Sequence, residues 1–148
     1  MSNVSIEIIN SIQQSKIIVV LVIEDDSKAS DLIDCLYDSG IKNYEIALRT
    51  NNSRKSADII SKKGLDINLG LGTILTIDDV NFAVDIGANF ALAPGTNKTV
   101  IDEANRLNLP FFPGVCTPSD IEKANELGCS VLKFFLLNHA EVLIILNQ

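Results

Sequence analysis

The stretch "YEIALR" (44–49) is the clearest of several short β-rich runs, and it indicates how the chain folds. Successive side chains of a strand alternate between its two faces. One face of this run is apolar and suited to packing against helices: Tyr44, Ile46 and Leu48. The other face carries Glu45, Ala47 and Arg49. A carboxylate and a guanidinium are therefore expected on the face turned away from the helices.

Runs of the same kind recur along the chain at intervals of roughly 20 to 26 residues. They are "IIVVLVI" (17–23), "INLGLGT" (67–73), "FALAPG" (90–95), "FFPGV" (111–115) and "SVLKFF" (130–135). The segments between them have helical spacing of apolar residues, and several open on Ser, Thr or Asp and end at Gly, which favours capped helices. Strand–helix alternation at this period predicts βα units and a parallel sheet.

Two α/β architectures fit this alternation: an open doubly wound sheet, and a (β/α)8 barrel of the TIM type. A complete barrel needs at least about 200 residues, whereas this chain has 148 residues and six visible βα units. The length suits one sizeable core, so residues 1–148 are expected to form one domain. The start "MSNVSIEIINSIQQSK" predicts a short amphipathic helix, not a signal peptide.

Bulk composition narrows the classes of partner and the cellular compartment. The net charge of −7 and a pI of about 4.6 argue against nucleic acid and anionic membranes as partners. An odd count of three cysteines without a C-x-x-C pair argues against a disulfide framework and a zinc site, and suits a reducing cytoplasm. No apolar run reaches the roughly 18 residues of a membrane-spanning helix.

Lysine in the middle of an apolar strand is the feature that points to chemistry. In "SVLKFF" the alternation places Val131, Lys133 and Phe135 on one face. In "INLGLGT" the corresponding set is expected to be Leu69, Leu71 and Thr73. Glu45, Arg49, Thr73 and Lys133 are then expected to converge on one interior, with Arg49, Thr73 and Phe135 at the carboxyl ends of strands, where barrel active sites lie.

These residue types together suit carbanion chemistry on a 2-keto acid. Apolar surroundings and a nearby cation such as Arg49 disfavour the ammonium form of a lysine, whose free amine forms a Schiff base with a ketone. Glu45 can move protons, while Arg49 and Thr73 can hold a carboxylate. Structural alternatives remain open: a lysine that reaches solvent, a Glu45–Arg49 ion pair that only shapes the interior, a threonine that favours strands, and glycines that relieve crowding.

Five motifs carry a resemblance to a known family: "EIALRT" (45–50), "GLGTIL" (70–75), "ALAPG" (91–95), "FFPGVCTPSD" (111–120) and "LKFF" (132–135). They resemble, in order and spacing, the successive strand motifs of the 2-keto-3-deoxy-6-phosphogluconate (KDPG) and 4-hydroxy-2-oxoglutarate (KHG) aldolase family. The likeness runs from about residue 14 to 135. It implies a TIM-type (β/α)8 barrel, of which about six units are present here, and a homotrimer.

The resemblance also implies an activity and a role for each site residue. The expected reaction is a metal-free and cofactor-free class I cleavage of KDPG to pyruvate and glyceraldehyde 3-phosphate, with KHG as a further substrate. Lys133 would form the Schiff base and Glu45 would transfer protons. Arg49 and Thr73 would bind pyruvate, and Pro94 would line the substrate pocket. Phe135 is also expected to bind substrate, because it lies at the carboxyl end of its strand.

Beyond Phe135 the sequence departs from the family. Family members continue with "PAE" and two units with phosphate-binding Gly-rich loops, whereas residues 136–148 read "LLNHAEVLIILNQ". A one-base frame shift in a suitable message for PAESCGGTNYLKS yields this tail, so a truncated or frameshifted member is expected, with a helix or strand near 140–148 and His139 at the surface. Two further hypotheses stay open: an inactive truncated product, and an aldolase for a related 2-keto acid.

Overall fold

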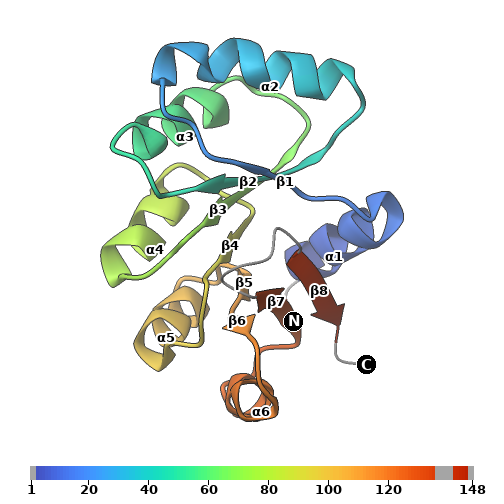
Figure 1. Ribbon diagram of the computed structural model, residues 1–148, viewed down its shortest axis with the longest axis vertical. Helices are drawn as coiled ribbons and strands as arrows, with labels where there is room; N and C mark the ends of the chain where they lie inside the picture. Colours follow the sequence, from blue (N-terminus) through green and yellow to red (C-terminus); the bar gives the residue numbers. More distant parts are fainter. Residues whose placement is uncertain (1–2, 136–141, 147–148) are drawn as a thin grey trace.

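The computed structural model describes residues 3–135 and 142–146 of the protein (Figure 1). The strands are β1 (Val19–Leu21), β2 (Asn43–Ala47), β3 (Asn68–Gly72), β4 (Phe90–Leu92), β5 (Phe111–Phe112), β6 (Gly114–Val115), β7 (Val131–Phe135) and β8 (Val142–Leu146). The helices are α1 (Asn3–Ser15), the 3-10 turn η1 (Asp26–Lys28), α2 (Ala29–Asp38), α3 (Ser53–Ser61), α4 (Ile77–Asp85), α5 (Lys98–Arg106) and α6 (Pro118–Glu126).

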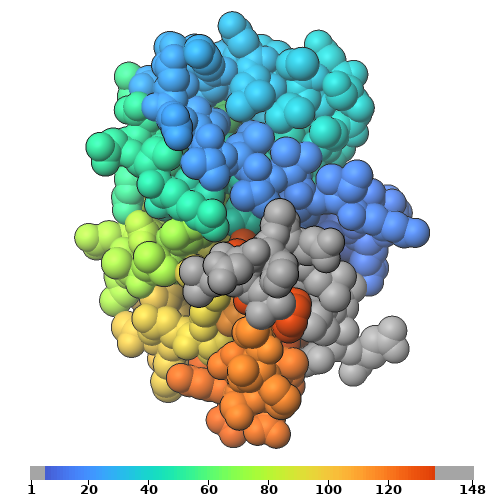
Figure 2. All heavy atoms as spheres, viewed as in Figure 1, coloured from blue at the N-terminus to red at the C-terminus, as the bar shows by residue number. Residues whose placement is uncertain are grey.

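The order of the strands distinguishes the two expected architectures. Strands β1 to β5 are hydrogen-bonded neighbours in chain order and run parallel, and β6 pairs with β7 in the same sense. A doubly wound sheet reverses its order at a switch point, whereas sequential parallel strands are those of a barrel. Figure 2 shows the units following one another down the molecule in chain order, from blue through green to orange. The prediction of a TIM-type barrel with about six units is therefore confirmed.

Pro113 divides the expected strand 111–115 into two pieces. Proline has no N–H to donate to a neighbouring strand, so it interrupts a hydrogen-bonded ladder. Its carbonyl instead accepts a hydrogen bond from the backbone N–H of Lys133, at 2.9 Å. As a result β5 pairs with β4, while β6 pairs with β7.

Two apolar clusters lie on opposite faces of the strands. The larger one fills the space between the strands and helices α2 to α6, and it includes Ile33, Ile46 and Leu132. The smaller one lies on the inner face and joins Phe90, Leu92, Phe112 and Val131 to Ile8 of α1. Helix α1 therefore packs against the inner face, unlike the other helices, which lie around the outside (Figure 1).

The same inner face holds a neutral hydrogen-bond network at the amino ends of β2 and β3. Ser11 of α1 donates to the amide oxygen of Asn43 at 3.0 Å. The amide nitrogen of Asn68 donates to the same oxygen at 2.7 Å and to the Ser11 hydroxyl at 2.9 Å, and the Asn43 amide nitrogen donates to Ser15 at 2.8 Å. Asn43 is fully buried, so this network fixes α1 over one end of the strands without any buried charge.

The expected capping signals account for the ends of the helices. Thr76 and Thr117 form capping boxes with Asp79 and Asp120 at the starts of α4 and α6. Gly87 and Gly128, with φ of 73° and 79°, follow the ends of the same two helices in the left-handed conformation that glycine adopts without strain. In the described part of the chain, no helix has the length and apolar character needed to cross a membrane.

The expected tail is described in part. Residues 142–146 form β8, which pairs antiparallel with β7, with Lys133 opposite Ile144. The expectation of a helix or strand in 140–148 is thus met by a strand. Residues 136–141, which include His139, and residues 147–148 lie outside the described residues. The predictions of a surface position for His139 and of an altered reading frame concern mainly these residues.

Candidate active site

Lys133 lies at the centre of β7 with its side chain directed to the inner face. Its residue is only 3% exposed, so the alternative of a lysine reaching solvent is wrong. Its Nζ donates to both carboxylate oxygens of Glu45, at 3.0 and 3.1 Å. The candidate nucleophile is therefore held in a buried ion pair.

Glu45 reaches Lys133 from β2, a strand 88 positions away in sequence. Glu45 is 1% exposed, and no buried side-chain polar atom of the described residues lacks a hydrogen-bond partner. The alternative of a Glu45–Arg49 ion pair is wrong, because the cation at Glu45 is Lys133. Removing one member of such a pair leaves an uncompensated buried charge, which is strongly destabilising.

Arg49 and Thr73 form a second pair just beyond the ends of β2 and β3. The Arg49 Nε donates to the Thr73 hydroxyl at 3.1 Å. Within residues 3–135 and 142–146 no carboxylate forms an ion pair with Arg49, whose side chain is exposed. Its remaining N–H groups can therefore bind an anionic ligand, and the Thr73 hydroxyl, which donates to no acceptor among the described residues, can serve the same purpose.

The expected inner face of β3 is wrong. Leu69 and Leu71 belong to the outer cluster between strands and helices. The inward positions are Gly70 and Gly72, which pair in register with Glu45 and Ala47. Thr73 is still near Arg49 because its φ is 62°, a left-handed conformation in which side chains no longer alternate as in a strand.

The remaining two predicted residues differ in position. The ring of Phe135, the last residue of β7, has its centroid 5.4 Å from the Lys133 Nζ and so covers one side of the amine. Pro94 lies exposed two residues beyond β4, with its carbonyl group close to Gly114 of β6. Its role in lining a substrate pocket stays a prediction.

The arrangement supplies a nucleophile, a proton carrier and an anion-binding pair. Lys133 provides the amine, Glu45 the carboxylate in direct contact with it, and Arg49 with Thr73 the anion-binding donors. Among the described residues, no group of three or more His, Cys, Asp and Glu side chains is placed to hold a metal ion. The sequence predicts that Glu45 and Lys133 face the same interior, and the structure places the carboxylate in direct contact with the amine.

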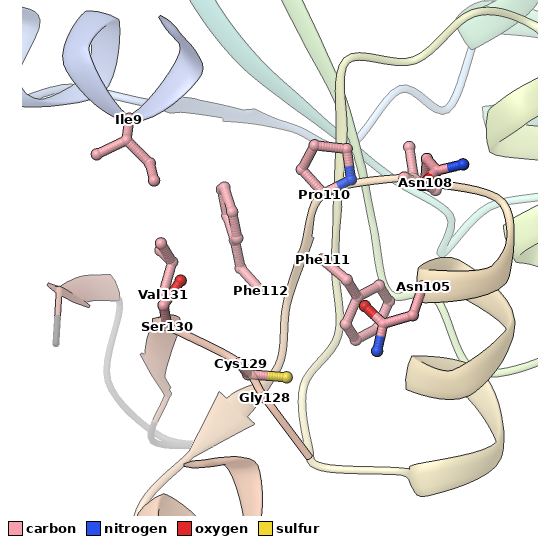
Figure 3. Close-up of a pocket in the computed structure, with 11 residues that line it drawn as sticks. Ile9, Asn105, Asn108, Pro110, Phe111, Phe112, Gly128, Cys129, Ser130 and Val131 are labelled. Carbon is pink, nitrogen blue, oxygen red and sulfur yellow. The ribbon is translucent and has the colours of Figure 1, made fainter. Parts of the chain in front are cut away.

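A separate cavity of about 260 Å³ lies at the opposite ends of the strands (Figure 3). It is bordered by the segments that lead into β5 and β7, and the figure shows Ile9, Phe112 and Val131 directed towards one another beside it. Cys129 is its one titratable lining residue, and burial raises the pKa of this thiol to about 11. The thiol is therefore protonated at neutral pH and is a poor nucleophile.

Comparison of the chain with known protein families identifies a match that covers most of its length. The model of the family described as "KDPG and KHG aldolase" matches residues 8–145. The chain therefore belongs to the KDPG and KHG aldolase family, as the sequence motifs predict.

Two curated relatives set the extent of the likeness. The chain is 32% identical to the 2-dehydro-3-deoxy-phosphogluconate aldolase of Treponema pallidum over 130 residues, which are 88% of this chain and 62% of the relative. It is also 32% identical to the enzyme of the same name from Haemophilus influenzae, over 91% of this chain and 64% of the relative. The chain thus spans a little under two thirds of the length of these relatives.

A solved structure is similar in fold as well. The KDPG aldolase of Legionella pneumophila, with pyruvate captured as a covalent carbinolamine intermediate, superposes with a TM-score of 0.76 at 30% identity. The match covers 80% of this chain and 57% of that one. In that protein pyruvate is thus bound covalently, which is the kind of chemistry that a buried lysine offers.

Proposed function

We propose that this chain carries the catalytic centre of a class I aldolase that cleaves KDPG to pyruvate and glyceraldehyde 3-phosphate. The observation that carries the proposal is the buried contact between Lys133 and Glu45, 3.0 Å from Nζ to Oε1. Family membership and the covalent pyruvate of the Legionella relative support it. Lys133 is the proposed Schiff-base residue and Glu45 the proposed proton carrier.

The reaction begins with proton transfer inside the ion pair. The Lys133 ammonium gives a proton to the Glu45 carboxylate, because an amine attacks only with a free electron pair. The amine then adds to the substrate C2 ketone to form a carbinolamine. Loss of one water gives the iminium, with the proton for the leaving hydroxyl coming from the Glu45 carboxyl group. At this stage Glu45 is again a carboxylate.

Carbon–carbon cleavage follows from the iminium as an electron sink. Glu45 removes the proton of the C4 hydroxyl, the C3–C4 bond breaks, and its electron pair moves into the enamine on Lys133 while the aldehyde leaves. Glu45 returns the proton to C3, and water hydrolyses the resulting pyruvate iminium. One carboxylate thus serves as base and acid in turn.

Arg49 and Thr73 are proposed to bind the C1 carboxylate of the 2-keto acid. The Arg49 guanidinium has N–H groups that donate to no carboxylate among the described residues. Its Nε donates to the Thr73 hydroxyl at 3.1 Å, and this contact fixes the orientation of the guanidinium. A clamp at C1 recognises the pyruvate half of the substrate. For that reason KHG, which yields pyruvate and glyoxylate, is proposed as a second substrate.

Borohydride trapping tests the proposal directly. The protein is incubated with pyruvate and sodium borohydride, digested and analysed by mass spectrometry. We expect a reduced pyruvate adduct on Lys133 and none in Lys133→Arg, which keeps the positive charge but forms no Schiff base. An unmodified Lys133, or an adduct on another lysine alone, contradicts the assignment.

A cleavage assay separates the competing hypotheses about turnover. Release of glyceraldehyde 3-phosphate from KDPG, followed with a coupled dehydrogenase, is the result expected of an active aldolase. Trapping without cleavage of KDPG or KHG favours the hypothesis of an inactive member of the family. Cleavage of a different 2-keto acid favours a related aldolase.

A homotrimer, a cytoplasmic location and a place in the Entner–Doudoroff route are also proposed, on the family resemblance. Size-exclusion chromatography with light scattering tests the trimer, with three times the 16.1 kDa mass of the chain as the expected result. A monomer at micromolar concentration contradicts it. Fractionation of cells that express the chain tests the location.

A further inference from the structure

The inner face of β3 presents two glycines, Gly70 and Gly72, beneath the proposed site. Neither has a positive φ, so neither is required for a backbone conformation that other residues avoid. An alanine at either position would leave the backbone unstrained, and the reason for glycine there must be space.

The space at Gly72 is filled by the side chain of Glu45. A Cβ built on residue 72 would lie 2.5 Å from the Glu45 Cδ and 2.7 Å from its Cγ, and it would overlap the Oε1 atom. Real Cβ atoms essentially never come within 3.0 Å of such neighbours. The same Oε1 atom accepts the hydrogen bond from Lys133.

The space at Gly70 is filled by a different side chain. A Cβ there would lie 2.5 Å from the Phe90 Cζ and 2.7 Å from its Cδ2. Phe90 stacks on Phe112, with ring centroids 5.4 Å apart, in the small inner cluster. The two glycines therefore make room for different side chains: Gly70 for the stacked aromatic ring of Phe90, and Gly72 for the Glu45 carboxylate of the ion pair.

We propose that Gly72 is a positioning residue for the reaction: the absence of a side chain on residue 72 holds open the place that the Glu45 carboxylate needs beside Lys133. This inference rests on the proposed function for its catalytic consequence, whereas the steric relation between Gly72 and Glu45 stands on the geometry alone. A side chain at position 72 overlaps the Glu45 carboxylate where it now lies and displaces it from its place beside the Lys133 amine. The proton transfers of Glu45 then fail, although Lys133 itself is unchanged.

A stability comparison tests the steric relation without any need for activity. Gly72→Ala is made in the wild-type chain and in Glu45→Ala/Lys133→Met, where the carboxylate that the new methyl group would meet is gone and no unpaired buried charge is left. We expect Gly72→Ala to lower the melting temperature in the wild-type chain and to have little effect in the Glu45→Ala/Lys133→Met background. Gly70→Ala is the matched control and lowers the melting temperature equally in both, because its neighbour is Phe90. An equal loss from Gly72→Ala in both backgrounds overturns the proposal.

A proton-exchange measurement tests the catalytic consequence. Bound to Lys133 as an iminium, pyruvate gives a methyl proton to Glu45 and takes back a deuteron from D2O, which is followed by NMR. We expect Gly72→Ala to slow this exchange at least about 100-fold, the lower range for loss of general acid–base catalysis. Glu45→Asp, whose carboxylate is one methylene shorter, should slow exchange less in Gly72→Ala than in the wild-type chain.

The outcomes are distinguishable. If the wild-type chain shows neither trapped adduct nor exchange, the proposed function fails while the stability comparison still decides the steric relation. If the wild-type chain exchanges and Gly72→Ala exchanges as fast, the positioning role is wrong. If the losses from Gly72→Ala and Glu45→Asp multiply as independent effects, the two residues are not coupled and the proposal is wrong.

Discussion

Strand β2 buries two polar side chains on one face, and they are stabilised in different ways. Asn43, at the amino end, shares neutral hydrogen bonds with Ser11, Ser15 and Asn68. Glu45, two residues further on, meets one cation, Lys133. A network of several neutral partners holds α1 in place and loses only part of its bonds with any one change. In the buried ion pair each charge is stabilised by one partner only. The pair can therefore transfer a proton, and losing either member lowers the stability of the fold strongly.

The largest effect is expected from breaking the charged pair. Lys133→Met keeps a long apolar side chain but leaves Glu45 buried without its cation, which should lower the free energy of unfolding by about 3–5 kcal/mol. Urea unfolding at pH 7 measures this. The double variant Glu45→Leu/Lys133→Met should recover most of the loss. A Lys133→Met chain as stable as the wild type would contradict the comparison.

A smaller effect is expected at the neutral end. Asn43→Ala removes the shared acceptor of Ser11 and Asn68, and should lower the free energy of unfolding by about 2 kcal/mol. The rate of pyruvate trapping by Lys133 should stay within about twofold of wild type, since the network has no contact with the amine. A large fall in trapping, with the fold intact by circular dichroism, would show that the two ends are not independent.

Alkaline pH offers a third test, at the amino ends of the strands. Burial raises the pKa of Cys129 from its ordinary value of 9.0 to about 11. Between these values the unfolded chain loses the thiol proton and the folded chain keeps it, so stability falls as pH rises from 9 to 11. The expected loss is about 2 kcal/mol, measured by urea unfolding at pH 8, 9.5 and 10.5. In Cys129→Ala this contribution should vanish; an unchanged slope would contradict it.

The smallest effect on stability is expected from Thr73→Gly, which should stabilise the fold slightly and weaken the binding of pyruvate. A β-branched residue at φ 62° is strained by about 1–2 kcal/mol. Thr73→Gly removes that strain but adds chain entropy to the unfolded state, so a net gain of at most about 1 kcal/mol is expected. The pyruvate concentration for half-maximal trapping should rise about tenfold. Thr73→Ser, which keeps the hydroxyl, should bind as the wild type; weaker binding there would contradict the hydroxyl's role.

The sequence predicted the inner face of two strands correctly and of a third incorrectly, for a physical reason. In β2 and β7 a charged residue lies between apolar ones, so alternation assigns Glu45 and Lys133 to the inside. In β3 the same alternation, extended through Thr73, assigns Leu69 and Leu71 to the inside together with Thr73. Thr73 is left-handed, so its side chain does not alternate with those of the strand, and Gly70 and Gly72 lie inside instead.

Two other features were not predicted. The division of the fifth strand depends on which neighbour accepts or donates each hydrogen bond around Pro113, and this is a matter of tertiary pairing. The neutral network had a visible signal: Asn43, Asn68 and Asn89 each begin or directly precede a strand. Parallel strands in register bring such residues together, and the Asn89 amide oxygen indeed accepts from the Leu69 N–H at 2.8 Å.

Pro113 has a consequence for how the molecule opens. It separates the sheet into one ladder that contains Glu45 and another that contains Lys133. The two reactive side chains therefore belong to different ladders, and the run of backbone pairings between these ladders is interrupted at Pro113, although the two apolar clusters include residues of both. Any loosening between the ladders parts the amine from its carboxylate, so hydrogen-exchange protection of the two ladders should report directly on the fraction of molecules able to react.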